Sequence, residues 1–167
     1  MIRKLVAGLA LILSAGTMQA QAAPITVFVV RHAEKGPEAM NPPLTPEGRQ
    51  RATELARVLG DSKITAVFAS EFKRAQETVD PLAKAAGLTT IVIPATALDS
   101  LVLTLRALPP GSHAVVASHS NLVHLIVDKL SGVRIPLLAD TDYDRLVVVT
   151  VGAPGQSDAV VLRYGER

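Results

Sequence analysis

The stretch ITVFVVRH at residues 25–32 determines the class of fold. Its first six residues form a nearly continuous apolar run, which is typical of a strand buried on both faces of a sheet. Sheets of this kind are mostly parallel and are covered by helices. Arg31 and His32 follow the apolar run directly. The stretch therefore predicts a buried strand with chemically active side chains at its carboxyl end.

Strand-like and helix-like segments alternate along the rest of the chain. Further strands are expected at 64–69, 88–93 and 114–117, and a final antiparallel pair at 145–151 and 159–164. Each of the first four strands is followed by a segment with helical spacing or helix-capping residues. This alternation predicts a three-layer α/β/α fold, with a mostly parallel sheet and helices on both faces.

The predicted helices have recognisable ends. The first begins with Thr45 as the N-cap and Pro46 at the first helical position, and it ends at Gly60. The second covers 72–86, and Pro81 within it is expected to kink or break the helix. Two more helices are predicted at 100–108, capped by Asp99 or Ser100, and at 121–130.

Residues 1–22 have the pattern of a secretory signal peptide. Arg3 and Lys4 precede an apolar run at 5–15, which is shorter than the ~20 residues of a membrane span. Cleavage is expected near Ala22 or Ala23, and an uncleaved anchor is the alternative. We therefore expect one domain at 23–167, exported to the periplasm or secreted, with no stable membrane insertion after cleavage.

The composition excludes or disfavours several classes of chemistry and partner. The chain has 167 residues, a formal net charge of +2 and no cysteine, which excludes disulfides and thiolate chemistry. Arg3 and Lys4 account for that net charge, so the domain is formally neutral and the basic pI does not indicate a nucleic-acid partner. Aromatic residues make up 3% of the chain, too few to favour a surface on which bases stack.

Three predicted strands end in unusual side chains. The first ends in Arg31 and His32, the second runs into 70–74 with Arg74, and the fourth is followed by His119. Because ligands of such sheets bind at the carboxyl ends of the strands, two histidines and two arginines should converge there. Guanidinium groups suit phosphate oxygens, and a neutral histidine can attack phosphorus. This set fits phosphoryl transfer without a metal or another cofactor.

Four motifs carry a resemblance to a known family. They are VRHAEK at 30–35, LTPEG at 44–48, the pattern from Ser70 through Arg74 to Thr78, and VASHSN at 116–121. In order and spacing they resemble the signatures of the histidine phosphatase (phosphoglycerate mutase-like) superfamily over about 25–151. The resemblance implies that 23–167 is a histidine phosphatase domain and that the protein hydrolyses a phosphate ester or phosphohistidine.

The resemblance also implies roles for individual residues. His32 would be the nucleophile that forms a phosphohistidine, while Arg31, Arg74 and His119 would bind the phosphoryl group. Many relatives supply a general acid after the third strand, and the acidic residue nearest that place here is Asp99. A plain N-cap is its alternative role, and Glu34 is the alternative proton donor.

Other functions remain open from the sequence. A non-catalytic protein that binds a phosphorylated ligand is one, and a metal-dependent hydrolase is another. His113, His119 and His124 lack the spacing of a zinc site, and the loop at 140–144 lacks the glycine and glutamate of a calcium loop. The short chain resembles compact members that act on phosphohistidine proteins or lipopolysaccharide-core sugar phosphates. Export favours a phosphorylated small molecule or an envelope glycan as substrate, and no feature indicates an oligomeric state.

Overall fold

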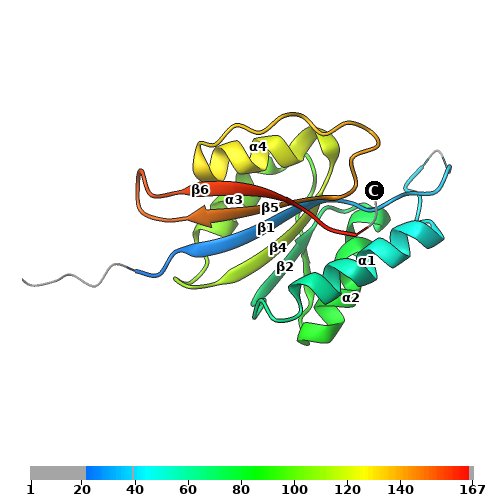
Figure 1. Ribbon diagram of the computed structural model, residues 1–167, viewed down its shortest axis with the longest axis horizontal. Helices are drawn as coiled ribbons and strands as arrows, with labels where there is room; N and C mark the ends of the chain where they lie inside the picture. Colours follow the sequence, from blue (N-terminus) through cyan, green and yellow to red (C-terminus); the bar gives the residue numbers. More distant parts are fainter. Residues whose placement is uncertain (1–21, 39, 166–167) are drawn as a thin grey trace, which may run out of the picture.

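A six-stranded sheet with helices on both faces forms the described part of the chain (Figure 1). The computed structural model describes residues 22–38 and 40–165. The predicted signal peptide at 1–22 therefore lies outside the described residues, apart from Ala22. The strands are β1 (Ile25–Arg31), β2 (Ala66–Ala69), β3 (Thr90–Val92), β4 (His113–Ser118), β5 (Arg145–Val151) and β6 (Asp158–Arg163).

The strand order is β3-β2-β4-β1-β5-β6. The first four strands pair in parallel, whereas β5 is antiparallel to β1 and β6 is antiparallel to β5. The predicted α/β/α class and the antiparallel pair at the end of the sheet are both confirmed. The strand at 88–93 is shorter than expected, because pairing with β2 involves three residues.

Two helices cover each face of the sheet (Figure 1). On one face, α1 (Pro46–Leu59) and α2 (Lys73–Ala86) pack against the strands through apolar side chains such as Leu55 and Leu82. On the other face, α3 (Leu98–Arg106) and α4 (Ser120–Ser131) pack through side chains such as Leu105 and Ile126. None of the helices in the described ranges is long and apolar enough to cross a membrane.

Two expectations about helices are contradicted, namely a break at Pro81 and a cap at Asp99 or Ser100. Pro81 does not break α2, which continues from Lys73 to Ala86. Buried residues lie on both sides of the proline, with Val79 before it and Leu82 after it, so packing on the sheet holds the two halves in one helix. The third helix begins at Leu98 with Ala97 as its N-cap, so neither Asp99 nor Ser100 caps it.

The entry to α1 supports the loop that follows β1. Thr45 is the N-cap, as predicted, and its hydroxyl accepts a hydrogen bond from the backbone N–H of Gly48. A side chain at Gly48 would overlap the carbonyl oxygen of Glu34. The glycine therefore lets α1 lie directly against the chain two residues after His32.

The register of the parallel strands brings three strand ends to one place. Arg31 of β1 pairs with Ser118 of β4, and Ala69 of β2 pairs with Ala117 of β4. The backbone N–H of His32 extends this ladder by donating to the carbonyl oxygen of Ser118 at 2.8 Å. Consequently, the residues that follow β1, β2 and β4 lie side by side.

Candidate active site

An open pocket with a volume of about 620 Å³ lies at these strand ends, within the size range of small-molecule sites. Four of the five predicted site residues line it, namely Arg31, His32, Arg74 and His119. Asp99 is not among the lining residues. The pocket is completed by Lys35, Phe72, Ala95, Thr96, Leu98, Ser120, Asn121, Leu122 and Asp140.

His32 is held as a neutral ring with one nitrogen free. Its side chain is 4% exposed, and Nδ1 lies 2.8 Å from the carbonyl oxygen of Ala33. A carbonyl oxygen can only accept, so Nδ1 donates its hydrogen and Nε2 keeps its lone pair. Burial lowers the pKa of His32 to about 3, with smaller contributions from His119, Arg31 and Arg74. At neutral pH the ring is therefore unprotonated at Nε2 and able to act as a nucleophile.

Thr78 connects the loop after His32 to α2. Its hydroxyl accepts a hydrogen bond from the backbone N–H of Ala33 at 2.9 Å and donates one to the carbonyl oxygen of Arg74 at 2.6 Å. Thr78 is fully buried. The threonine of the motif therefore ties the segment that orients His32 to the turn of α2 that carries Arg74.

His119 is the second buried ring of the pocket. It is 8% exposed, and its ring centre lies 5.3 Å from that of His32. Its Nε2 lies 2.9 Å from the hydroxyl oxygen of Ser70, at the end of β2. Burial lowers the pKa of His119 to about 4, and Arg74 contributes in the same direction. This ring, too, is neutral at neutral pH.

The two arginines leave positive charge without a close carboxylate. Arg31 is 5% exposed, donates from Nη1 to the carbonyl oxygen of Ala139 at 2.9 Å and lies 4.1 Å from the centre of the Tyr143 ring. Its nearest carboxylate is Asp140, 4.0 Å away and almost fully exposed. Water screens such a contact, so it compensates little of the charge.

Arg74 has no hydrogen bond or ion pair to any residue in the described ranges, and its guanidinium lies 4.4 Å from the centre of the Phe72 ring. Burial and the neighbouring Arg31 lower the pKa of Arg74. The Nε atoms of both arginines are buried without a partner. A bound anion with several oxygens would supply acceptors for these donors and balance the two charges.

Both predicted proton donors are engaged elsewhere. Asp99 lies in the first turn of α3, is 83% exposed and forms an ion pair with Lys129 of α4 at 2.9 Å. Glu34 forms a 2.7 Å ion pair with Arg51, whose Nε also donates to both carboxylate oxygens. Neither carboxylate lines the pocket. The structure therefore does not bring Asp99 or Glu34 to the other four residues.

Sequence reasoning gave no role to three polar or aromatic residues around the site. Ser70 contacts His119, and Phe72 and Tyr143 each stack on one arginine. The chain has three phenylalanines and two tyrosines, and two of these five rings flank the arginines of the pocket. Aromatic residues are rare in this chain, so the position of Phe72 two residues before Arg74 was a signal that its ring flanks the site.

The three histidines considered for a metal site do not come together. Among the described residues, no group of three histidine, aspartate or glutamate side chains is placed to hold a metal ion. His113 lies at the opposite end of β4, where its Nδ1 contacts the carbonyl oxygen of Ser62. The loop at 140–144 and the preceding Ala139 instead contact Arg31, through the Tyr143 ring and the Ala139 carbonyl oxygen.

Because both pocket rings are neutral when folded, acid should destabilise the protein. In the unfolded chain a histidine has a pKa of 6.5, whereas folding lowers that of His32 to about 3. Below about pH 6.5 the unfolded state binds protons that the folded state does not, so stability falls as the pH drops toward 3. For His32 the free energy of unfolding is expected to fall by up to about 2 kcal/mol between about pH 7.5 and about pH 5.

Urea unfolding at these two pH values tests this expectation. The decrease in the free energy of unfolding on acidification should be smaller in His32→Asn than in the wild type. It should be the same as in the wild type in His113→Asn, because His113 lies outside the pocket. An equal loss in the wild type and in His32→Asn would show that His32 is not held as a neutral ring.

Comparisons with known proteins agree with this geometry. The sequence model of the histidine phosphatase superfamily (branch 1) matches residues 27–98. A comparison with curated proteins finds no match. The family resemblance seen in the four motifs is thus confirmed over the part of the chain that carries the first three.

Solved structures extend the similarity to most of the chain. The protein histidine phosphatase SixA complexed with tungstate is 25% identical, with a TM-score of 0.69 over 83% of this chain and 96% of that one. A mycobacterial glucosyl-3-phosphoglycerate phosphatase in complex with VO3 is 16% identical, with a TM-score of 0.67 over 84% and 99%. The structure of the "Putative Phosphohistidine Phosphatase SixA from Nakamurella multipartitia" is 19% identical, with a TM-score of 0.59 over 87% and 98%.

Proposed function

The chain carries the fold and the motifs of the histidine phosphatase superfamily, and we propose that it is a phosphatase acting through a covalent phosphohistidine. One observation carries the proposal. A neutral histidine with a free Nε2 lines the same pocket as two arginines that have no close, buried carboxylate among the described residues. That arrangement combines a nucleophile with a site for an anion.

The reaction proceeds in two steps. First, Nε2 of His32 attacks phosphorus, the bond from phosphorus to the leaving group breaks, and the leaving group departs with the electron pair. Arg31, Arg74 and His119 hold the phosphoryl oxygens as their charge redistributes. Second, a water molecule attacks the phosphohistidine, the P–N bond breaks, and neutral His32 and inorganic phosphate are released with the proton of the water.

The leaving group should take its proton from water. Asp99 and Glu34 are paired with Lys129 and Arg51, and the carboxylate at the pocket rim, Asp140, stands exposed beside Arg31. If none of these three carboxylates protonates the leaving group, the first step is fast when that group is stable as an anion or already protonated. This favours aryl phosphates and phosphohistidine over simple alkyl phosphates.

A series of aryl phosphates with increasingly basic leaving groups tests this preference. We expect kcat/KM to fall steeply as the leaving group becomes more basic. Asp99→Asn and Glu34→Gln should keep the same slope as the wild type. A shallow dependence in the wild type that becomes steep in one of these variants would instead identify that carboxylate as the proton donor.

The physiological substrate is proposed on less direct grounds. The similar structures include a protein histidine phosphatase and a glucosyl-3-phosphoglycerate phosphatase, which act on a phosphorylated protein and on a phosphorylated glycoside. If residues 1–22 direct export, a phosphorylated small molecule or an envelope glycan is the substrate, and the protein works in the periplasm or outside the cell. Fractionation of cells that express the full chain would test the location.

Two other functions predict different results. A non-catalytic binding protein would bind vanadate or phosphate in this pocket without turning over any phosphate ester. A metal-dependent hydrolase would lose its activity on dialysis against a chelator and regain it when metal is added. The proposed enzyme hydrolyses an aryl phosphate at the same rate before and after this treatment.

A further inference from the structure

We propose that Ser70 is a positioning residue whose hydroxyl keeps the ring hydrogen of His119 on Nδ1, so that this N–H points at the transferring phosphoryl group. The inference rests on the proposed function, because it assigns His119 the task of donating a hydrogen bond to a phosphoryl oxygen. It concerns a side chain that lies outside the set of four residues expected to bind or attack the phosphoryl group.

The contact itself is short and buried. The hydroxyl oxygen of Ser70 lies 2.9 Å from Nε2 of His119, and the two residues are 4% and 8% exposed. Ser70 forms no other side-chain hydrogen bond within the described ranges. The hydroxyl and Nε2 are therefore each other's partner within the protein.

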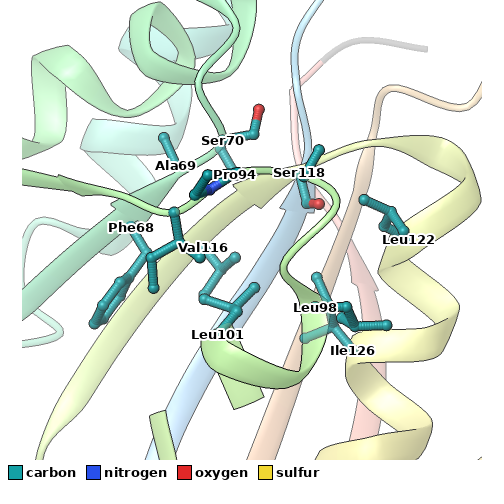
Figure 2. Close-up of a pocket in the computed structure, with 13 residues that line it drawn as sticks. Phe68, Ala69, Ser70, Pro94, Leu98, Leu101, Val116, Ser118, Leu122 and Ile126 are labelled. Carbon is teal, nitrogen blue, oxygen red and sulfur yellow. The ribbon is translucent and has the colours of Figure 1, made fainter. Parts of the chain in front are cut away.

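The surroundings of Ser70 are mainly apolar, and Ser118, which also lines the cavity beside it, forms no hydrogen bond with its hydroxyl. Behind it lies a small cavity lined mainly by apolar side chains from β2, β4, α3 and α4, among them Phe68, Val116 and Leu101. Figure 2 shows the hydroxyl oxygen of Ser70 pointing away from these side chains. The hydroxyl is thus turned from the cavity toward His119.

Two arrangements of hydrogen atoms would fit the 2.9 Å contact. In one, the Ser70 hydroxyl donates to Nε2, and the single hydrogen of the neutral ring sits on Nδ1. In the other, Nε2 carries the hydrogen and donates it to Ser70, which leaves the serine hydrogen without an acceptor. Buried donors are rarely left unpaired, because a donor removed from water without an acceptor destabilises the folded protein. The first arrangement satisfies both groups.

A phosphoryl group in the pocket favours the same arrangement. Nδ1 of His119 has no hydrogen-bond partner among the described residues, so it is the nitrogen available to a ligand. With the hydrogen on Nδ1, the ring donates to a phosphoryl oxygen. With the hydrogen on Nε2, the Nδ1 lone pair would face the negative oxygens and repel them. Phosphate binding and the Ser70 contact therefore select one tautomer together.

The neighbouring rings keep His119 in this orientation. Phe72 packs at 90° to it with ring centres 5.2 Å apart, and His32 packs on it with ring centres 5.3 Å apart. His32 also carries its hydrogen on Nδ1, but donates it to the carbonyl oxygen of Ala33. The same tautomer therefore gives His32 a lone pair with which it can attack phosphorus. It gives His119 an N–H that can donate to a phosphoryl oxygen.

Nitrogen NMR of the full chain labelled on histidine tests the assignment directly. The chain has four histidines, so the signals can be assigned with single variants. At neutral pH with no anion bound, we expect His119 of the wild type in the Nδ1–H tautomer. Ser70→Ala should give a mixture or the Nε2–H tautomer, whereas Ser70→Thr, which keeps the hydroxyl, should retain the wild-type signal.

Kinetics provide the second measurement. Ser70→Ala is expected to lower kcat for an aryl phosphate by about 10- to 100-fold with a smaller change in KM, and Ser70→Thr should recover most of the loss. Ser118→Ala is the matched control, because Ser118 is a buried serine at the neighbouring strand end whose side chain forms no hydrogen bond with His119. It should leave the His119 tautomer unchanged.

The outcomes separate this inference from the proposed function. An Nε2–H tautomer at His119 in the wild type, or an unchanged tautomer in Ser70→Ala, would overturn the role of Ser70 even in an active phosphatase. The predicted tautomers in a protein without phosphatase activity would support the role of Ser70 in anion binding while refuting the proposed reaction. Because the first outcome is measured in the wild type, it does not depend on whether Ser70→Ala folds.

Discussion

Replacing His32 with alanine is expected to lower kcat for an aryl phosphate by at least about 10³-fold. The ring lines the pocket with Nδ1 bonded to the carbonyl oxygen of Ala33 and Nε2 free to attack phosphorus. Arg31, Arg74 and His119 remain in the variant, so vanadate should still bind. Loss of turnover with retained binding would separate the chemical step from recognition of the phosphoryl group.

His113→Asn is the control for this experiment. His113 is a half-buried histidine at the opposite end of β4 from the pocket, and its replacement should leave kcat within about twofold of the wild type. If His32→Ala kept its activity, His32 would not be the nucleophile. His119 would then be the next candidate, because it is the other ring that lines the pocket.

Replacing Arg74 with alanine is expected to lower kcat/KM by about 10²- to 10³-fold and to abolish vanadate binding at concentrations that saturate the wild type. The guanidinium of Arg74 packs on the Phe72 ring but has no hydrogen-bond or ion-pair partner within the described part of the chain, so its donors are available to the ligand. Arg74→Lys keeps the charge but loses the forked donor geometry, and it should fall between alanine and the wild type.

The stability of Arg74→Ala gives an independent result. In the folded protein, burial and the like charge of Arg31 both disfavour the charged form of Arg74 and lower the pKa of its guanidinium. Removing the side chain should therefore leave the free energy of unfolding unchanged or raise it. Lys73→Ala, at the exposed neighbouring position, should change neither stability nor activity. A clear loss of stability in Arg74→Ala would indicate a structural role instead.

The sheet and the convergence of the site could be predicted because both follow from short-range patterns. The apolar run before Arg31 specifies a doubly buried strand, and the carboxyl ends of parallel strands necessarily share one edge. Arg31 ends β1, and His32 and His119 directly follow β1 and β4, so the backbone of the sheet fixes their positions. Arg74, in the first turn of α2, follows β2 closely enough to be placed in the same way.

The proton donor could not be predicted from the same patterns. Asp99 follows β3 in the sequence, but α3 begins at Leu98, and the carboxylate is turned toward Lys129 on α4. Glu34 is next to the site in sequence, but Arg51 of α1 binds its carboxylate. In both cases a partner from a distant part of the chain decides where the side chain points. Pro81 is similar, because tertiary packing overrides a local helix-breaking signal.

The role of Ser70 also required the structure. A serine in a motif gives no indication of which atom its hydroxyl contacts, and the partner of Ser70 lies 49 residues away in the sequence. The contact depends on the pairing of β2 with β4, which sets Ser70 beside His119. Once that pairing is known, the limited number of buried hydrogen-bond partners determines the tautomer.

The most direct test of the account is to trap the phosphorylated protein during turnover. The wild-type chain is mixed with an aryl phosphate, quenched in alkaline denaturant, in which phosphohistidine is stable, and digested for mass spectrometry. We expect one phosphoryl group on His32 that is lost on brief acid treatment and is absent from His32→Ala. A phosphoryl group found on another residue, or steady hydrolysis with repeated rapid quenches showing no phosphorylated protein at all, would contradict it.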